Sequence, residues 1–132
     1  MVHPRVPRYI KGDRCAGILR TSDGEVPLSS GEDGPGRWLL DNHPGGPGSG
    51  RTRAWTHVEG HAASLMRQHH IRTAELFINQ VPCGPTGAAK CRNVLYKLLP
   101  VGSTLDVHYP KDDGTVGTWR FVGGQRGWTV IR

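Results

Sequence analysis

The chain has 132 residues, enough for one domain with a modest hydrophobic core. Lys and Arg number 17 against 11 Asp and Glu, and the net charge of +6 suits a polyanionic partner such as nucleic acid, although an ordinary basic domain is an equal alternative. Three cysteines are too few for a disulfide framework, and no apolar run approaches a membrane span or a signal-peptide core. We therefore expect no membrane partner, no targeting signal in this chain, and a free thiol at Cys15.

Residues 1–13 are rich in proline and basic side chains, which is typical of a leader or linker without a core of its own. Residues 14–132 form the predicted domain. It opens with a β-hairpin over residues 14–28, because two apolar runs flank the turn sequence S-D-G at residues 22–24. Pro27 cannot donate to a β-ladder, so the second strand of this hairpin is expected at an edge or at its end.

Residues 29–53 consist mainly of Gly, Pro, Asp and Ser. A stretch this long without secondary structure is usually either functional or disordered. The apolar run W-L-L at residues 38–40 interrupts it, and predicts either a small cap packed on the core or one wall of a binding pocket. Arginines flank this region and could meet phosphate groups; they are Arg37, Arg51 and Arg53.

Two amphipathic helices are predicted next along the chain. The first begins after Thr56, a suitable N-cap, and the second spans residues 88–99, ending at Pro100. Their apolar faces are Val58, Ala62, Leu65, Met66 and His69 in the first, and Cys91, Val94, Leu95, Leu98 and Leu99 in the second. The histidines of the first helix, His61, His69 and His70, are expected at the surface or at its end.

Strands are predicted between and after these helices. An apolar run over residues 73–81 predicts a buried strand that ends at Asn79, and residues 103–109 alternate as a strand does. The turn sequence D-D-G leads into a further strand at 116–122, and a last one is possible at 127–132. The order β-β-α-β-α-β-β predicts an α/β fold, a mixed sheet with helices packed on it and antiparallel C-terminal strands.

A metal-site pattern lies at the starts of the two helices. His57 and Glu59 lie at the start of the first helix. Cys83 follows a proline and lies before the second helix, and Cys91 lies in the first turn of that helix. The zinc nucleobase deaminases carry H-x-E…P-C-x-x-C, in which one His and two Cys hold Zn²⁺ and the Glu moves protons. Zn²⁺ accepts imidazole and thiolate together, and it lowers the pKa of a bound water to about 7. We therefore predict Zn²⁺ on His57, Cys83 and Cys91, with Glu59 as the catalytic acid–base group.

The spacing of the two cysteines departs from this pattern. Seven residues, rich in glycine and proline, separate Cys83 from Cys91, where the common spacing has two. A loop of this kind can return Cys91 to the metal just inside the next helix. The alternative is that both cysteines are small buried apolar residues and that His57 is an ordinary residue of the helix cap.

The same stretch resembles a known family. It is similar to the bacterial DddA-like DNA cytosine deaminase toxins. The similarity lies in the runs H-V-E-G-H-A-A-S-L-M-R, I-R-T-A-E-L-F-I-N and L-L-P-V-G-S-T-L-D-V, and in P-C and a later cysteine between the last two runs. The resemblance covers residues 18–109 and is clearest over 55–107. It implies a cytidine-deaminase-like fold with the zinc site at the N-termini of two helices. It also implies that L-S-S-G, at residues 28–31, is the loop ahead of the motif, and makes Ser30 and Gly31 candidate substrate-binding residues.

The family implies the C-terminal toxin domain of a secreted bacterial polymorphic toxin, which converts cytosine to uracil in DNA. Such a domain is delivered into target cells by a longer parent protein, acts in the cytoplasm and has a cognate immunity protein.

Two further side chains are candidate substrate contacts. Trp55 could stack on a base or pack in the core, and Asn79 could bind the substrate or cap the strand end. No second aromatic beside Trp55 would form a wedge, and the loop at 29–53 is pliable, so single-stranded DNA is favoured over double-stranded DNA. The alternatives are a double-stranded DNA cytosine deaminase, a deaminase of RNA or free nucleosides, and a non-catalytic nucleic-acid-binding module with a structural zinc, which would normally have four protein ligands.

Overall fold

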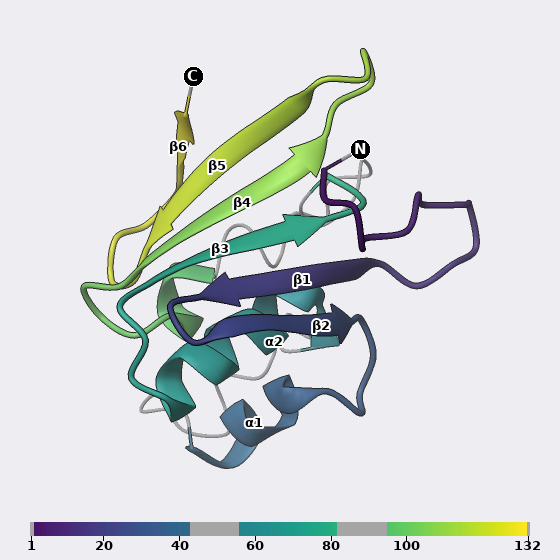
Figure 1. The fold of residues 1–132 in the computed structure, drawn as a ribbon. Coiled ribbons are helices and arrows are strands. Elements are labelled where there is room, and N and C mark those ends of the chain that lie inside the picture. The colour runs from purple at the N-terminus through teal and green to yellow at the C-terminus, as the bar shows by residue number, and fades with distance from the viewer. Residues whose placement is uncertain (1, 43–55, 82–94, 132) are drawn as a thin grey trace.

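The sheet dominates the computed structural model, which describes residues 2–42, 56–81 and 95–131. Its six strands lie in the order β2-β1-β3-β4-β5-β6 (Figure 1). The neighbours β3 and β4 run parallel, and every other pair in this sheet is antiparallel, so the predicted mixed sheet is confirmed. The strands are β1 (Ala16–Thr21), β2 (Gly24–Ser29), β3 (Thr73–Ile78), β4 (Thr104–Pro110), β5 (Val116–Val122) and β6 (Thr129–Ile131).

The predicted hairpins follow from local turn chemistry. β1 and β2 pair antiparallel across the turn at residues 22–23, where Gly24 adopts a φ of 130° that favours glycine. β2 is an edge strand of the sheet, as Pro27 predicts, because its outer side needs no ladder hydrogen bonds. The D-D-G turn connects β4 to β5 as an antiparallel pair, which also agrees with the prediction.

Helices cover one face of this sheet. They are the 3₁₀ turn η1 (Pro35–Arg37), α1 (Trp38–Asn42), α2 (Val58–Gln68) and a helical stretch at residues 95–98 (Figure 1). Leu39 is buried in the main core, and Trp38 packs against it, so this short stretch is the cap on the core rather than a wall of the pocket described below. None of the described helices is long and apolar enough to cross a membrane.

The main core lies between α2 and the sheet. Gly17 of β1 lets the helix approach closely, because a Cβ there would lie 2.7 Å from the Phe77 carbonyl oxygen and 2.9 Å from Cγ1 of Val58. The buried apolar residues of this core come from the strands, α1, α2 and the helical stretch at 95–98. They include Leu19, Leu39, Val58, Ala62, Met66, Leu76, Ile78, Leu95, Leu99, Leu105, Val107 and Phe121.

Three details of α2 correct the sequence analysis. The helix has His57 as its N-cap residue, one position later than the predicted cap at Thr56. His69 is exposed because it is the C-cap, beyond the last helical turn, so its expected position at the surface or helix end is confirmed and its place on the apolar face is wrong. His61 was expected at the surface and is instead completely buried. The spacing of apolar residues did not indicate this, because the groups that pair with His61 come from a distant loop.

The N-terminal segment, residues 2–13, lies against the opposite face of the sheet (Figure 1). Val6 is 6% exposed and packs with Ile18 of β1 and Phe77 of β3 in a second, smaller apolar cluster. The side-chain amide of Asn79 donates a hydrogen bond of 3.0 Å to the carbonyl oxygen of Pro7. The segment therefore contacts the sheet through both apolar and polar groups.

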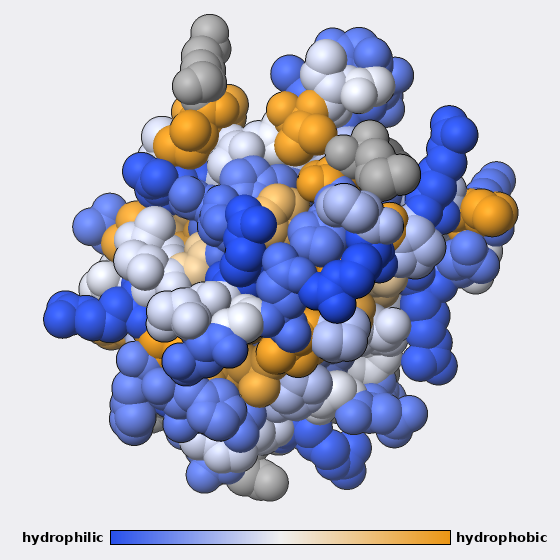
Figure 2. Space-filling model, viewed as in Figure 1, coloured by the Kyte–Doolittle hydropathy of each residue, from blue (hydrophilic) through white to orange (hydrophobic). Residues whose placement is uncertain are grey.

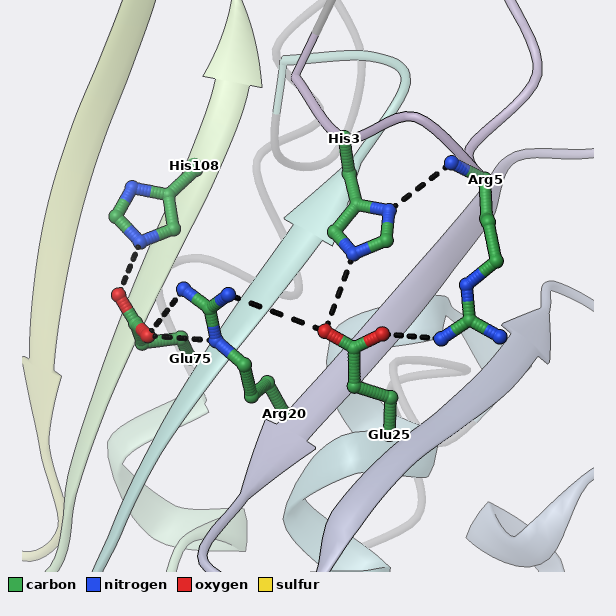
Figure 3. Close-up of polar contacts among 6 residues, drawn as sticks. All are labelled: His3, Arg5, Arg20, Glu25, Glu75 and His108. Atoms are coloured by element: carbon green, nitrogen blue, oxygen red, sulfur yellow. Dashed lines mark hydrogen bonds and ion pairs between the residues drawn. The ribbon is translucent and has the colours of Figure 1, made fainter.

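Charged side chains connect the strands on the same face. The Arg20 guanidinium donates to the Glu75 carboxylate at 2.7 Å and lies 3.9 Å from that of Glu25 (Figure 3). Glu25 also pairs with His3 and Arg5 of the N-terminal segment. Hydrophilic side chains accordingly spread across this face, with smaller apolar patches between them (Figure 2). Hydrogen bonds from Arg5 and His3 hold the pKa of the Glu25 carboxyl below its usual value, so Glu25 is ionised at neutral pH.

We expect substitution of Val6 by serine to lower the free energy of unfolding by about 1–3 kcal/mol, because a buried aliphatic side chain is lost and a hydroxyl is placed in an apolar cluster. The matched control is Ile10→Ser, since Ile10 belongs to the same segment but is 67% exposed. Chemical denaturation measures both variants. Equal stability of the two would show that the segment does not pack on the sheet in solution.

Candidate active site

A cavity of about 390 Å³ opens at the N-terminal end of α2. His57 and Glu59 both line it, so the fold brings the first two elements of the sequence motif to one site. Ser30, another predicted site residue, also lines this cavity. The other lining residues come from the start of β1, from α2 and from the turn after β3, and they are Asp13, Arg14, Cys15, Val58, Gln80 and Val81.

The start of α2 explains how His57 and Glu59 reach one cavity. His57 has an extended backbone (φ −81°, ψ 158°), and its carbonyl oxygen accepts the first helical hydrogen bond, 3.0 Å from the His61 nitrogen. Glu59 lies in the first turn and is only 3% exposed. The positive end of the helix dipole favours a carboxylate at this position. The local H-x-E spacing therefore brings an imidazole and a carboxylate to the lining of one cavity at a helix N-terminus.

The His57 imidazole is suited to bind a metal ion. It is half-buried, and this burial lowers its pKa below the usual value for histidine. A neutral imidazole keeps the nitrogen lone pair that a metal ligand needs.

Cys15 is a residue of this cavity that the sequence analysis did not assign. It lies just before β1, far from the motif in sequence, so no spacing rule pointed to it. Burial, with a smaller contribution from the negative charge of Glu59, raises the pKa of its thiol to about 12. Cys15 therefore contributes a neutral, weakly polar wall beside the Glu59 carboxylate.

The buried imidazole of His61 holds the loop that forms the cavity rim. Its Nδ1 accepts a hydrogen bond from the Gly36 N–H at 2.8 Å, and its Nε2 lies 2.9 Å from the Gly31 carbonyl oxygen. Because a carbonyl can only accept, Nε2 carries the proton and the ring is neutral. Burial also lowers the pKa of His61, which agrees with this neutral form. The Gly31 N–H in turn donates to the Thr56 carbonyl at 2.7 Å.

Further contacts tighten the same loop against α2. Gly34 lies so close to the ring that a Cβ there would be 2.6 Å from both nitrogens of His61. Ser64, one turn further along the helix, donates a hydrogen bond of 2.6 Å to the Pro35 carbonyl. Residues 30–36 are therefore fixed to the buried side of α2. The structure thus gives Gly31 a part in positioning this rim, next to the cavity-lining Ser30.

Asn79 uses its amide within the fold. Its Oδ1 accepts a hydrogen bond of 3.0 Å from the Ala16 N–H, while its Nδ2 donates to Pro7. The side chain is buried and joins the end of β3 to the start of β1 and to the N-terminal segment. The sequence left open whether Asn79 binds the substrate or caps the strand end. This geometry favours the structural role at the strand end. It places Asn79 next to Gln80, which lines the cavity.

The other predicted residues, Trp55, Cys83 and Cys91, lie outside the described residues. Within the described ranges, no group of three or more His, Cys, Asp or Glu side chains could hold a metal ion. His57 is thus the one predicted zinc ligand whose surroundings the structure describes, and its neutral imidazole fits that role.

Arg67 connects α2 to the helical stretch that follows the second cysteine. Its guanidinium donates hydrogen bonds to the carbonyl oxygens of Leu98 (2.6 Å), Leu99 (2.9 Å) and Lys97 (3.2 Å). These are carbonyls at the C-terminal end of that helix, where no intrahelical partner remains and a cation is favourable. The two helices predicted to carry the zinc ligands are therefore held to one another at the end away from the cavity.

Comparison with known proteins identifies the family. The family model of SCP1.201-like deaminases matches residues 3–125, which is most of the chain. The chain belongs to the SCP1.201-like deaminase family. No curated protein matches the chain. As an SCP1.201-like deaminase, the protein belongs to the hydrolases that act on C–N bonds, and its six-stranded mixed sheet with helices on one face is compatible with a deaminase fold.

We expect replacement of His61 by leucine to destabilise this SCP1.201-like deaminase by about 2–5 kcal/mol, because the Gly36 N–H and the Gly31 carbonyl would remain buried without partners. His61→Gln should retain much of the stability, since an amide can both accept and donate. The control His69→Leu alters an exposed histidine of the same helix and should change stability by about 0.5 kcal/mol or less. Thermal and chemical denaturation test this, and equal effects of the leucine and glutamine variants would contradict it.

Proposed function

We propose that this SCP1.201-like deaminase is a zinc-dependent cytosine deaminase that converts cytosine to uracil in DNA. The observation that carries the proposal is the cavity at the start of α2, where His57 and Glu59 lie together in a chain of a deaminase family. The H-V-E-G…P-C pattern and the net charge of +6 support a nucleic-acid substrate.

Each site residue has a separate role in the proposed deamination. A zinc ion held by His57, Cys83 and Cys91 would supply a water of lowered pKa at neutral pH. Glu59 would accept a proton from the attacking water and deliver it to the ring nitrogen and the leaving amine. Because Glu59 is only 3% exposed, its burial would limit the access of bulk water to these proton transfers. Ser30 lines the same cavity, on the rim fixed by His61, and would contact the base or its sugar.

We further propose that the domain acts as the C-terminal toxin of a secreted bacterial polymorphic toxin. The supporting observation is the resemblance of the H-V-E-G and M-R runs to the DddA-like toxins. A longer parent protein would deliver it into the cytoplasm of target cells, and an immunity protein would protect the producing cell. Single-stranded DNA is the favoured substrate, because an unpaired base avoids the cost of a few kcal/mol for flipping it out of a duplex.

The zinc assignment predicts which cysteines hold metal. Cys83→Ala and Cys91→Ala should each lose most of the bound zinc, because a structural or catalytic zinc site depends on each of its ligands. Cys15→Ala is the matched control, since it removes the third cysteine of the chain and should keep the metal. Metal analysis of the purified variants measures this. Loss of zinc from Cys15→Ala together with its retention in Cys91→Ala would show that the ligand set is wrong.

The catalytic assignment predicts that Glu59→Gln lowers the deamination rate by about 10²-fold or more, because general acid–base groups contribute at least that much. Zinc content and melting temperature should stay close to those of the wild-type protein. The assay follows uracil formation in a labelled single-stranded oligonucleotide with one cytosine. Near wild-type turnover by Glu59→Gln would remove Glu59 from the mechanism.

The same assay separates the competing substrates. The oligonucleotide is compared with its fully paired duplex, with RNA of the same sequence and with free deoxycytidine, at one salt concentration. We expect the single strand to react fastest. A faster reaction in the duplex would reverse the strand preference, and a reaction confined to RNA or nucleosides would replace the proposed substrate. Zinc binding without deamination of any of these would favour a non-catalytic binding module.

A further inference from the structure

A second, larger cavity adjoins the candidate active site. Its volume is about 600 Å³, and it shares Gln80 and Val81 with the cavity that contains His57 and Glu59. Its other walls are the N-terminal segment and the β4–β5 hairpin. A free nucleoside would need only the first cavity, whereas a polymer must continue beyond it. The shared wall makes the second cavity the place where the next nucleotide can lie.

The topology of the sheet points to the same edge. β3 and β4 are parallel, and residues at or just beyond their carboxyl ends, Asn79–Val81 and Pro110–Lys111, line the second cavity. In sheets with parallel strands, ligands bind beyond the carboxyl ends of the strands. Figure 1 shows the N-terminal segment beside these two strand ends, so it closes the cavity on its outer side.

The charges in this cavity suit a phosphate. Arg8 and Lys111 line it, opposed by one carboxylate, Asp112. Arg8 forms no ion pair or hydrogen bond with another side chain among the described residues, whereas Arg5 and Arg20 on the neighbouring surface are each paired with glutamate. Arg8 is therefore a cation at the cavity wall that no described carboxylate pairs with, although Asp112 lines the same cavity.

Two other features complete the cavity. Tyr9 is half-buried in its wall and offers an aromatic ring, a group on which bases stack without regard to sequence. The wall itself is held in place by Asn79, whose amide bonds Pro7 on the N-terminal segment and Ala16 at the start of β1. Asn79 thereby fixes the cation-bearing segment relative to the cavity that contains Glu59.

We propose that this second cavity binds the nucleotide adjoining the target cytosine, with Arg8 and Lys111 at its phosphate and Tyr9 beside its base. The proposal rests on the proposed DNA deaminase function and extends it to a substrate-binding subsite. Residues 2–13 are then part of the binding surface, because they supply Arg8 and Tyr9.

The test measures DNA binding by Glu59→Gln protein with a short fluorescent single-stranded oligonucleotide over a range of salt concentrations. The double variant Arg8→Ala/Lys111→Ala should bind at least about tenfold more weakly. The slope of log affinity against log salt should also fall by about 0.7, which corresponds to the one phosphate that is no longer neutralised. Asp112→Asn should bind more tightly, a result that misfolding cannot produce.

The matched control is Arg126→Ala. Arg126 is exposed and follows β5. Because β5 runs antiparallel to β4, Arg126 lies near the start of β4, at the end of the strands opposite to the second cavity. This variant removes one positive charge, as the single variant Arg8→Ala does, and should bind nearly as the Glu59→Gln parent does, whereas Arg8→Ala should bind more weakly. If Arg126→Ala weakens binding as much as Arg8→Ala does, only the overall charge matters and the subsite does not exist.

Turnover on dinucleotides locates the subsite. The double variant is made in the otherwise wild-type enzyme and assayed on two dinucleotides, which carry the extra nucleotide on opposite sides of the cytosine. For one of them KM should rise while kcat stays unchanged. For the other, neither constant should change. An equal loss on both dinucleotides and on deoxycytidine would overturn the subsite. Failure of the wild-type protein to deaminate any DNA would instead overturn the proposed function, so the two outcomes are distinguishable.

Discussion

The buried imidazole of His61 is the interaction on which the candidate active site depends. It satisfies a backbone N–H and a backbone carbonyl of the loop at residues 30–36, and both groups would otherwise be buried without partners. Because His61 is one helical turn after His57, the same helix that presents the imidazole and carboxylate of the motif also fixes the opposite rim. The distance across the cavity is thus set by a contact within the protein core.

The position of α2 itself depends on close packing and on polar contacts at its two ends. Gly17 allows the helix to lie directly on β1, and a side chain at this position would collide with the backbone of β3. At the other end, Arg67 binds the terminal carbonyls of the helical stretch at residues 95–98. These contacts leave the helix N-terminus, with its favourable field for anions, at the carboxyl edge of β3. A deaminase needs its acid–base group at such a fixed position, since proton transfer requires hydrogen-bond distances.

The outer face of the sheet has a different role. Phe77 lies there between two histidine rings, with its centroid 4.7 Å from that of His108 and 5.1 Å from that of His3. Around it, Arg20 and the carboxylates of Glu25 and Glu75 form a connected set of charges that includes residues of the N-terminal segment (Figure 3). Individually these exposed pairs contribute little to stability. Together with the buried Val6 they hold that segment on the sheet, and so they place its later residues beside the candidate active site.

The sequence alone predicted the features that depend on neighbours along the chain. Turn residues such as Gly24 located the hairpins, apolar spacing located α2 and the strands, and the H-x-E spacing indicated that His57 and Glu59 share one site. The hairpin, helix and strand predictions succeeded because backbone dihedrals and helical periodicity are set by residues a few positions apart, and for the same reason His57 and Glu59 line one cavity.

The tertiary structure decided which distant groups meet. It placed Cys15 in the wall of the cavity, buried His61 under the loop at residues 30–36, and used Asn79 to join the N-terminal segment to β1. No local pattern indicates such contacts, because the hydrogen-bond partners are backbone groups that every residue carries. Which backbone group lies opposite a given side chain is decided only when the helices pack on the sheet.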